Sequence, residues 1–192
     1  MLLSKALLSV GAIASDDDAR PLLQHIKVDR ENGKVTAVAT DSYILAEVIQ
    51  ETPDPLEFPK IGNDENQPIE HALIDATVAL AASKGIPRKV VLPILNYALV
   101  EKNAISTTNL DTSTRHSYRD IEGKYPDYKK LIPAPADFSV NLNSKYLIAA
   151  CKLFDEHDGM SIEFGKTKMD PVVLRSNSAG VQKTVLVMPL RA

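Results

Sequence analysis

The sequence contains little of several residue types that define common protein classes. Its 192 residues include one cysteine, Cys151, and no tryptophan. A single cysteine excludes a disulfide within the chain and any zinc cluster built from cysteines, and it fits a reducing compartment. Only eight glycines are present, and no stretch forms the glycine-rich loop that cradles a nucleotide phosphate.

An excess of positive charge and a long hydrophobic run are also absent. The net charge is -3, so contact with nucleic acid requires a local basic patch rather than bulk attraction. No run approaches the roughly 20 apolar residues that cross a membrane. The N-terminal stretch MLLSKALLSVGAIAS spaces its apolar residues and contains Lys5, unlike a signal peptide. We expect a cytoplasmic protein without a membrane partner.

What is present is a pattern of short elements. Apolar residues spaced as on one helix face predict a helix near the N-terminus: Leu3, Ala6, Leu7, Val10 and Ile13. Two runs rich in β-branched residues follow at 21–28 and 35–50, and Asn32-Gly33 between them predicts a hairpin. Residues 1–50 therefore predict a helix followed by three strands, with no strand before the helix.

The same order of elements recurs twice. After a proline-rich connector at 51–68, we predict a strand at 69–74, a helix that Asp75 caps and Gly85 ends, and strands at 89–94, 97–102 and 104–118, the last in two pieces. After a second connector at 123–137, we predict a strand at 138–142, a helix capped by Asn143 or Ser144, and strands at 160–165, 171–176 and 184–190. The fold class is therefore α+β, with three β-α-β-β-β repeats near 1–50, 66–120 and 137–192.

Residue types that could perform catalysis are present but not arranged for it. The triple Asp16–Asp18 follows a helix, where acidic residues commonly form a solvated turn. The four histidines lack metal-ligand spacing, and the best local cluster, around His157, lies within one turn. No nucleophile elbow is present. We predict no enzyme, no metal and no cofactor, and a metal-dependent hydrolase is the least favoured alternative.

Three segments together resemble the bacterial DNA polymerase III beta subunit, the sliding clamp. They are RPLLQHIKVDRENGKVTAVATDSYILAEV, KYPDYKKLIP and TVLVMPLR, and they occur in the family's order. The segment FSVNLNSKYLIAACKLF also resembles the strand and helix that open the last half-domain of such clamps. The resemblance implies a DNA-clamp (processivity) fold, with helices on one face of antiparallel sheets. It implies a complete domain at 1–133, two repeats plus a linker, and a half-domain at 137–192, where a full clamp protomer has six repeats.

The resemblance also implies an apolar groove that binds short peptides of a DNA polymerase or other partners. Carried over residue by residue, the groove consists of Leu23, Thr40, Ser42, Tyr43, Ile44, Leu45, Pro126, Lys130, Leu131, Leu186, Val187, Met188, Pro189, Leu190 and Arg191. The plain alternative is that these are core strand residues. Tyr43 and Ile44 stand where the family has His and Arg, which makes the surface more apolar and implies a changed partner preference.

The implied function is a polymerase processivity factor that encircles double-stranded DNA. Three repeats per chain imply a homo-oligomer, a dimer or a tetramer, with third repeat paired against third repeat. The expected DNA-facing residues are lysines on the predicted helices, for which ordinary solvated lysines are the alternative: Lys5, Lys84, Lys145 and Lys152. A second hypothesis is a binding module of the same fold that captures clamp-binding peptides as a regulator, without encircling DNA.

Overall fold

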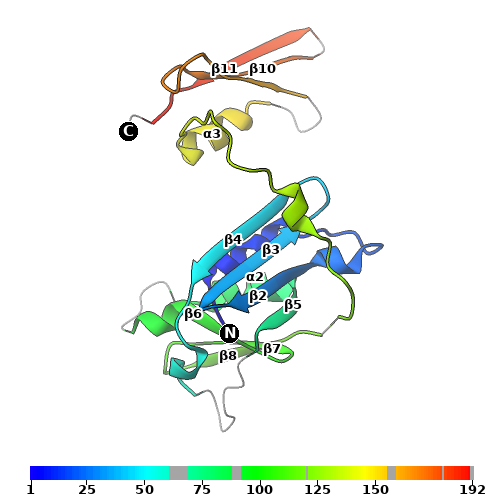
Figure 1. The fold of residues 1–192 in the computed structure, drawn as a ribbon, viewed down its shortest axis with the longest axis vertical. Helices are drawn as coiled ribbons and strands as arrows, with labels where there is room; N and C mark the ends of the chain where they lie inside the picture. The colour runs from blue at the N-terminus through cyan, green and yellow to red at the C-terminus, as the bar shows by residue number, and fades with distance from the viewer. Residues whose placement is uncertain (61–68, 88–91, 120, 155–158, 179, 191–192) are drawn as a thin grey trace. The chain divides into compact units, whose positions relative to one another are not determined.

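The chain folds into two compact units, unit 1 from Met1 to Asp127 and unit 2 from Tyr128 to Ala192 (Figure 1). This computed structural model describes residues 1–60, 69–87, 92–119, 121–154, 159–178 and 180–190. Both units combine short helices with purely antiparallel sheets, which confirms the predicted α+β class. The sequence predicts a domain boundary at 133–137, whereas the two compact units meet at Asp127 and Tyr128.

The first repeat of unit 1 begins with a strand. Its elements are β1 (Leu2–Ser4), α1 (Lys5–Ser9), the 3-10 turns η1 (Val10–Ile13) and η2 (Pro21–Gln24), β2 (His25–Glu31), β3 (Lys34–Thr40) and β4 (Leu45–Glu51). Ser4 ends the strand and caps α1, because its hydroxyl accepts a hydrogen bond from the Leu7 amide. The prediction that no strand precedes this helix was wrong. The apolar spacing from Leu3 onward is helical, but Leu2–Ser4 adopt an extended conformation because they pair with β6, far along the chain.

The second repeat follows the predicted order of elements more closely. It contains η3 (Pro55–Glu57) in the connector, then β5 (His71–Asp75), α2 (Ala76–Gly85), η4 (Pro93–Asn96), β6 (Tyr97–Glu101), β7 (Ala104–Thr108) and β8 (Ser113–Ser117). Asp75 caps α2 as predicted, because its carboxylate accepts from the amides of Thr77 and Val78 at 2.8 and 3.2 Å. Of the strand predicted at 89–94, residues 89–91 lie outside the described residues, and the rest is wrong because η4 begins at Pro93.

The two repeats of unit 1 interlock by exchanging their first strands. One sheet has the order β4-β3-β2-β5 and the other β1-β6-β7-β8. Thus β5, from the second repeat, joins the sheet of the first repeat, and β1 joins the sheet of the second. Because each sheet contains a strand of the other repeat, neither repeat can separate without breaking hydrogen bonds and exposing apolar surface.

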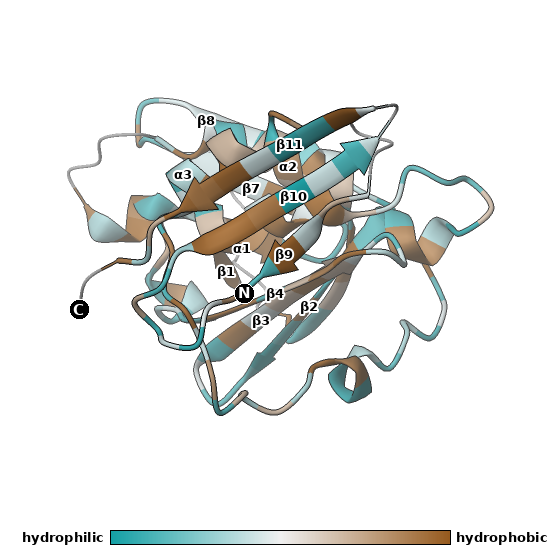
Figure 2. Ribbon diagram, turned by 90° about the horizontal axis from the view of Figure 1, so that it is seen from above, coloured by the Kyte–Doolittle hydropathy of each residue, from teal (hydrophilic) through white to brown (hydrophobic). Residues whose placement is uncertain are grey.

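A single hydrophobic core joins both sheets and both helices of unit 1. It includes Leu7 and Leu8 of α1, Ala79 of α2, and Ile26 and Ile105 of the two sheets, all fully buried. The N-terminal helix region and β1 are hydrophobic at the centre of the view in Figure 2. A smaller cluster covers the other side of the β1–β6 pair, where Phe58 from the proline-rich connector is 2% exposed. The connector therefore contributes to the core as well as linking the repeats.

Unit 2 holds a single repeat. It consists of η5 (Tyr128–Leu131), α3 (Ser144–Cys151), β9 (Ser161–Glu163), β10 (Val172–Ser178) and β11 (Val181–Val187), with sheet order β11-β10-β9. Asn143 caps α3. The core is small and includes Ala150, Leu174 and Val187, and β10 is hydrophobic at its start and hydrophilic towards its end (Figure 2). The strand predicted at 138–142 is wrong, because among the described residues this segment joins no sheet.

Candidate functional site

The turn between β3 and β4 holds most of the predicted groove residues of unit 1. Thr40 donates its hydroxyl to the Ile44 carbonyl at 2.7 Å and accepts the Ser42 amide at 3.1 Å. Asp41 accepts the amides of Tyr43 and Ile44, both at 2.8 Å. These backbone hydrogen bonds, that from Ile44 first, hold the pKa of the exposed Asp41 carboxyl below its usual value. Thr40 and Asp41 thus stabilise the turn at the end of β3 through hydrogen bonds, and they are not arranged for catalysis.

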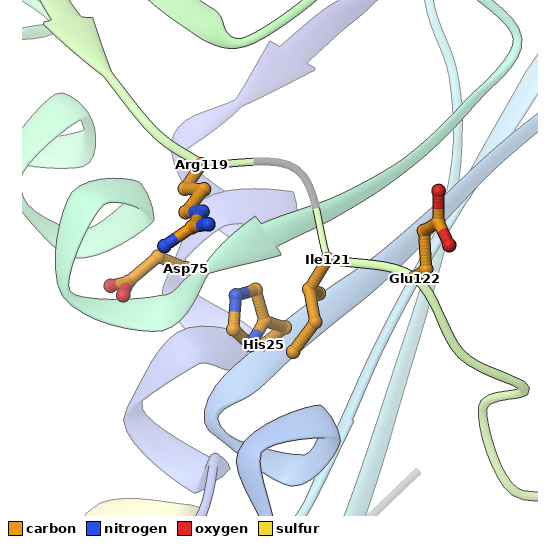
Figure 3. A pocket seen from close by; sticks show the side chains of 5 residues that line it. All are labelled: His25, Asp75, Arg119, Ile121 and Glu122. Atoms are coloured by element: carbon orange, nitrogen blue, oxygen red, sulfur yellow. The ribbon is translucent and has the colours of Figure 1, made fainter.

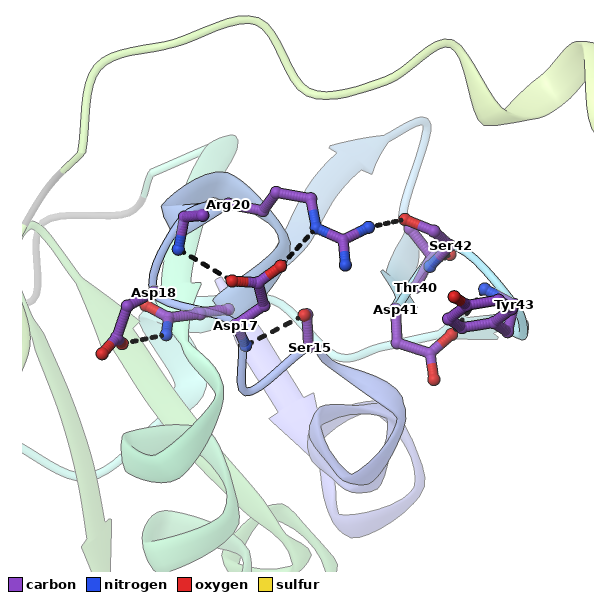
Figure 4. A network of polar contacts seen from close by, with 10 residues as sticks. Ser15, Asp17, Asp18, Arg20, Thr40, Asp41, Ser42 and Tyr43 are labelled. Atoms are coloured by element: carbon purple, nitrogen blue, oxygen red, sulfur yellow. Dashed lines mark hydrogen bonds and ion pairs between the residues drawn. The ribbon is translucent and has the colours of Figure 1, made fainter. Parts of the chain in front are cut away.

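A second polar contact ties this turn to the segment after α1. Arg20 donates one guanidinium N–H to the Ser42 hydroxyl at 2.7 Å and another to the Asp17 carboxylate at 2.8 Å (Figure 4). Asp17 also accepts the amide of Ala19, so the triple-aspartate segment forms a turn as predicted. Ser42 needs this support because its φ of 85° lies in the left-handed region. The turn is therefore held in one conformation from both sides.

The held turn projects two apolar side chains. Tyr43 is 94% exposed and Ile44 is 50% exposed, whereas Leu45 at the start of β4 is half-buried. Leu23, also predicted for the groove, is buried at 8% exposure. It lies in η2, before β2.

The linker before unit 2 packs on unit 1 beside this turn. At Gly123 it passes so near Leu22 that a Cβ would lie 2.7 Å from that side chain. Tyr125 is buried, with its hydroxyl near the Thr40 backbone but outside hydrogen-bond geometry, and burial raises the pKa of Tyr125 to about 12. Pro126, the predicted groove residue of this segment, is exposed.

The same turn occurs in the second repeat. Comparing the two turns shows which features belong to the repeat and which belong to the first turn alone. Thr108 repeats both bonds of Thr40, accepting the Leu110 amide and donating to the Thr112 carbonyl. Asn109 stands in place of Asp41 and accepts the amides of Asp111 and Thr112. The hydrogen-bonded turn therefore belongs to the repeat. Its Tyr-Ile tip and its link to Arg20 belong to the first repeat.

The remaining predicted residues belong to unit 2, where an apolar groove of about 520 Å³ contains most of them. Its lining residues are Tyr146, Ala149, Ala150, Leu153, Val185, Leu186, Val187, Met188, Pro189 and Leu190. Leu186, Met188 and Leu190 are half or more exposed, while Val187 is a core residue at 3% exposure. The Leu190 amide donates to the Asn141 carbonyl at 2.8 Å, which fixes the chain after β11 against the segment before α3.

The helical wall of this groove was missed by the sequence analysis. Tyr146, Ala149, Ala150 and Leu153 recur at i, i+3, i+4 and i+7, so they share one side of α3 and its end. Tyr146 and Leu153 are about 60% exposed. The spacing was visible in the sequence, but such a stripe ordinarily indicates a core face. Lys130 and Leu131, predicted from the linker, lie exposed in η5, and Arg191 lies outside the described residues.

The predicted DNA-facing lysines are all exposed. Lys5 and Lys84 lie on α1 and α2, which pack against each other, whereas Lys145 and Lys152 lie on α3 and at its end. None of the three α-helices contains an aspartate or glutamate, although the chain has 25 acidic residues. The helices are therefore locally basic on a chain of net negative charge.

A pocket lined mostly by ionisable side chains lies in unit 1, at the start of α2 (Figure 3). It is lined by His25, Asp75, Arg119, Ile121 and Glu122. Burial favours a raised pKa for Asp75, but hydrogen bonds from Thr77 and Val78 outweigh it and leave the pKa lowered. Asp75 caps a helix and His25 contacts the Pro21 carbonyl at 2.8 Å, so both have structural roles. Among the described residues, no group of three or more His, Cys, Asp or Glu could hold a metal ion, and the predicted cluster around His157 lies outside them.

No helix within the described ranges is long and apolar enough to cross a membrane.

Antiparallel sheets with packed helices, arranged in β-α-β-β-β repeats, define the fold class of the DNA sliding clamps. No protein-family model matches the sequence, and no curated protein matches it either. Solved structures, in contrast, match almost the whole chain.

The DNA polymerase sliding clamp of Bacillus subtilis matches with a TM-score of 0.69 at 18% identity, over 98% of this chain and 48% of that chain. The beta subunit from DNA polymerase of Streptococcus pyogenes matches with a TM-score of 0.66 at 16% identity, over 100% and 50%. The sliding clamp of Pseudomonas aeruginosa matches with a TM-score of 0.67 at 15% identity, over 100% and 52%. The chain therefore has the fold predicted from the three sequence segments, and it spans about half the length of these clamps.

Proposed function

We propose that the chain is a sliding-clamp-like processivity factor that docks partner peptides in an apolar groove and encircles DNA as a homo-oligomer. The groove of unit 2 carries the proposal. Leu186, Met188 and Leu190 line one side of it, and Tyr146 and Leu153 of the α3 side line the other. A concave apolar site with a few exposed anchor positions suits a short peptide with apolar side chains. Met188 adds a flexible side chain that can adapt to several partners.

The Tyr43–Ile44 tip of unit 1 is the second part of the proposed peptide site. Its side chains are exposed while the backbone beneath them is fixed by Asp41 and Arg20. A rigid turn loses little conformational freedom when a partner binds, so it favours affinity. The resemblance to clamps groups Tyr43, Ile44 and Leu45 with residues 186–191, at and after the end of β11, in one groove, and this grouping is part of the proposal.

Peptide binding tests the groove directly. We expect a short labelled peptide with two or three Leu or Phe anchors to bind, and Met188→Ala to weaken it at least about fivefold, as for a contact residue in an apolar site. Leu45→Ala should weaken it as well. Fluorescence anisotropy measures both, and Leu56→Ala provides a matched control because Leu56 is 69% exposed in η3 and belongs neither to the 40–45 turn nor to the lining of the unit 2 groove. Unchanged affinity in both test variants would refute the groove, and a loss with Met188→Ala alone would confine it to unit 2.

DNA encirclement is proposed from the helices. Helices without aspartate or glutamate carry exposed lysines in each unit, Lys5 and Lys84 in unit 1 and Lys145 and Lys152 in unit 2, and these suit diffuse contact with phosphates. An encircling protein should stay on circular DNA and slide off the same DNA after linearisation, even in salt that screens these lysines. Gel filtration of the complexes, formed with a loader or at high protein concentration, measures this difference.

A non-encircling peptide-binding module is the second candidate, and one observation favours it. The groove described above is formed entirely by residues of unit 2, so it needs no ring. Peptide affinity together with equal loss from circular and linear DNA would support this module and exclude encirclement.

A further inference from the structure

Strand exchange in unit 1 follows a fixed register. In each repeat the residue before the helix cap pairs with the second residue of the receiving strand. Leu3, before Ser4, pairs with Ala98 of β6, and Ile74, before Asp75, pairs with Ile26 of β2. All four of these side chains are fully buried in one core. Each repeat thus donates one strand and receives one strand.

The third repeat has the same two parts, and among the described residues neither pairs with a strand of another repeat. The Asn141 carbonyl accepts the Leu190 amide from the chain after β11, which is a contact within the repeat. Residues 138–142 precede the α3 cap Asn143 and form no strand. The strand after the helix is β9, which pairs with β10 on one edge only. Its central residue Ile162 lies opposite Leu174, which is fully buried, so Ile162 faces the core side of the sheet. Ile162 is nevertheless 48% exposed.

The helix of the third repeat lacks a neighbour in the same way. In unit 1, α1 and the following turn η1 both pack on α2, and a Cβ added at Gly11 of η1 would lie 3.3 Å from Leu80. Leu80 is the fifth residue after the cap Asp75, and the fifth residue after the cap Asn143 is Ile148. Leu80 is half-buried, whereas Ile148 is 57% exposed.

We propose that two copies of this chain pair through their third repeats by exchanging residues 138–142. The segment of each copy adds to the free edge of β9 in the other, antiparallel, with Leu142 opposite Ile162. Two-fold pairing satisfies both exchanges at once, because donor and acceptor lie in the same repeat. The two α3 helices then pack through Ile148, as α1 and α2 do. A second copy is the occupant because, among the described residues, the third repeat alone combines an undonated segment before its helix with a free edge on the strand after it. The inference rests on the fold and holds whether or not the chain encircles DNA.

Light scattering of the 192-residue chain tests the pairing. We expect twice the chain mass of 21.0 kDa, and dissociation to a single chain mass in Ile162→Asp and in Ile148→Asp. Leu153→Asp is the matched control, because Leu153 is equally exposed near the end of α3 but lies on the groove side, five residues from Ile148. We expect this variant to remain paired. A single chain mass for the unsubstituted chain at all concentrations, or a mass unchanged by both test substitutions, would overturn the proposal.

A cross-link tests the register with the apolar side chains intact. If Leu142 lies opposite Ile162, then Asn141 lies opposite Glu163 of the other copy. Asn141→Cys with Glu163→Cys, in a Cys151→Ser background, should form a disulfide-linked dimer on non-reducing gels. Asn141→Cys with Ser161→Cys is two residues out of register and should cross-link at least several-fold less. Equal cross-linking of both pairs, or a disulfide formed only within one chain, would count against the exchange. Neither outcome depends on peptide or DNA binding.

Discussion

The first two repeats and the third are built from the same parts and differ in what those parts pair with. In unit 1 the segment before each helix is a strand paired in a sheet, because the other repeat offers it an edge. In unit 2 the corresponding segment, 138–142, has a similar strand-like sequence, but among the described residues no other repeat pairs with it, and it forms no strand. The difference teaches that this strand is a conditional element, determined by a partner repeat more than by its own residues.

The largest expected effect comes from truncating the two corresponding residues before the helix caps. Ile74 is fully buried between the repeats, so Ile74→Ala should lower the free energy of unfolding by about 2–5 kcal/mol. Leu142 is half-buried, so Leu142→Ala should cost about 1 kcal/mol or less in dilute solution. Urea unfolding followed by circular dichroism measures both.

Protein concentration sharpens this first comparison. If third repeats pair, the cost of Leu142→Ala should grow as the chain becomes more concentrated, while the cost of Ile74→Ala stays constant. Equal losses for the two variants in dilute solution would show that residues 138–142 are as well packed as β5, contrary to the comparison.

Sequence patterns predicted the elements that depend on local signals. Asn32-Gly33 marked a hairpin, Asp75 a helix cap, and residues 104–118 two strands, and all three are confirmed. The errors concern pairing over long distances. Leu2–Ser4 pairs with residues about 95 positions away, which no local period reveals, and residues 138–142 have strand composition but join none of the described sheets.

The candidate site was predictable to a similar extent. The motif resemblance indicated the turn at 40–45 and the chain at the end of β11. In the structure the turn carries exposed apolar residues, and the chain at the end of β11 lines a groove. Tyr146 and Leu153 were not predicted, because an apolar stripe on a helix usually packs into a core. They stay exposed because the core of unit 2 is too small to cover them.

A smaller effect should distinguish the two repeated turns by their response to acid. The pKa of Asp41 is lowered in the folded chain, so its contribution to stability is present above the unfolded pKa and is lost as pH falls below about 4. Asn109 makes the equivalent hydrogen bonds without a charge. We expect Asp41→Asn to remove the acid-dependent change of the Ile44 amide in NMR spectra while keeping the turn.

The reciprocal substitution is the control for this prediction. Asn109→Asp should give the Thr112 amide a new pH dependence, with a midpoint below that of an ordinary aspartate. If the Ile44 amide titrates identically with and without the Asp41 carboxyl, then another group controls this turn.

The smallest expected effect on stability is at the tip of the first turn, where the two repeats differ most. Tyr43 is 94% exposed, and its backbone position is fixed by Asp41 rather than by its ring. Tyr43→Ser should therefore change the free energy of unfolding by less than about 0.5 kcal/mol. Asp111→Ser, at the equivalent position of the second turn, should be similarly neutral.

Peptide affinity should separate these two variants, because an exposed tyrosine on a rigid turn is available for contact with a partner and not for packing. Tyr43→Ser should lower the affinity for the peptide with Leu or Phe anchors severalfold in fluorescence anisotropy, and Asp111→Ser should leave this affinity unchanged. Equal affinities for both variants would mean that the tip of the first turn is ordinary surface, like that of the second.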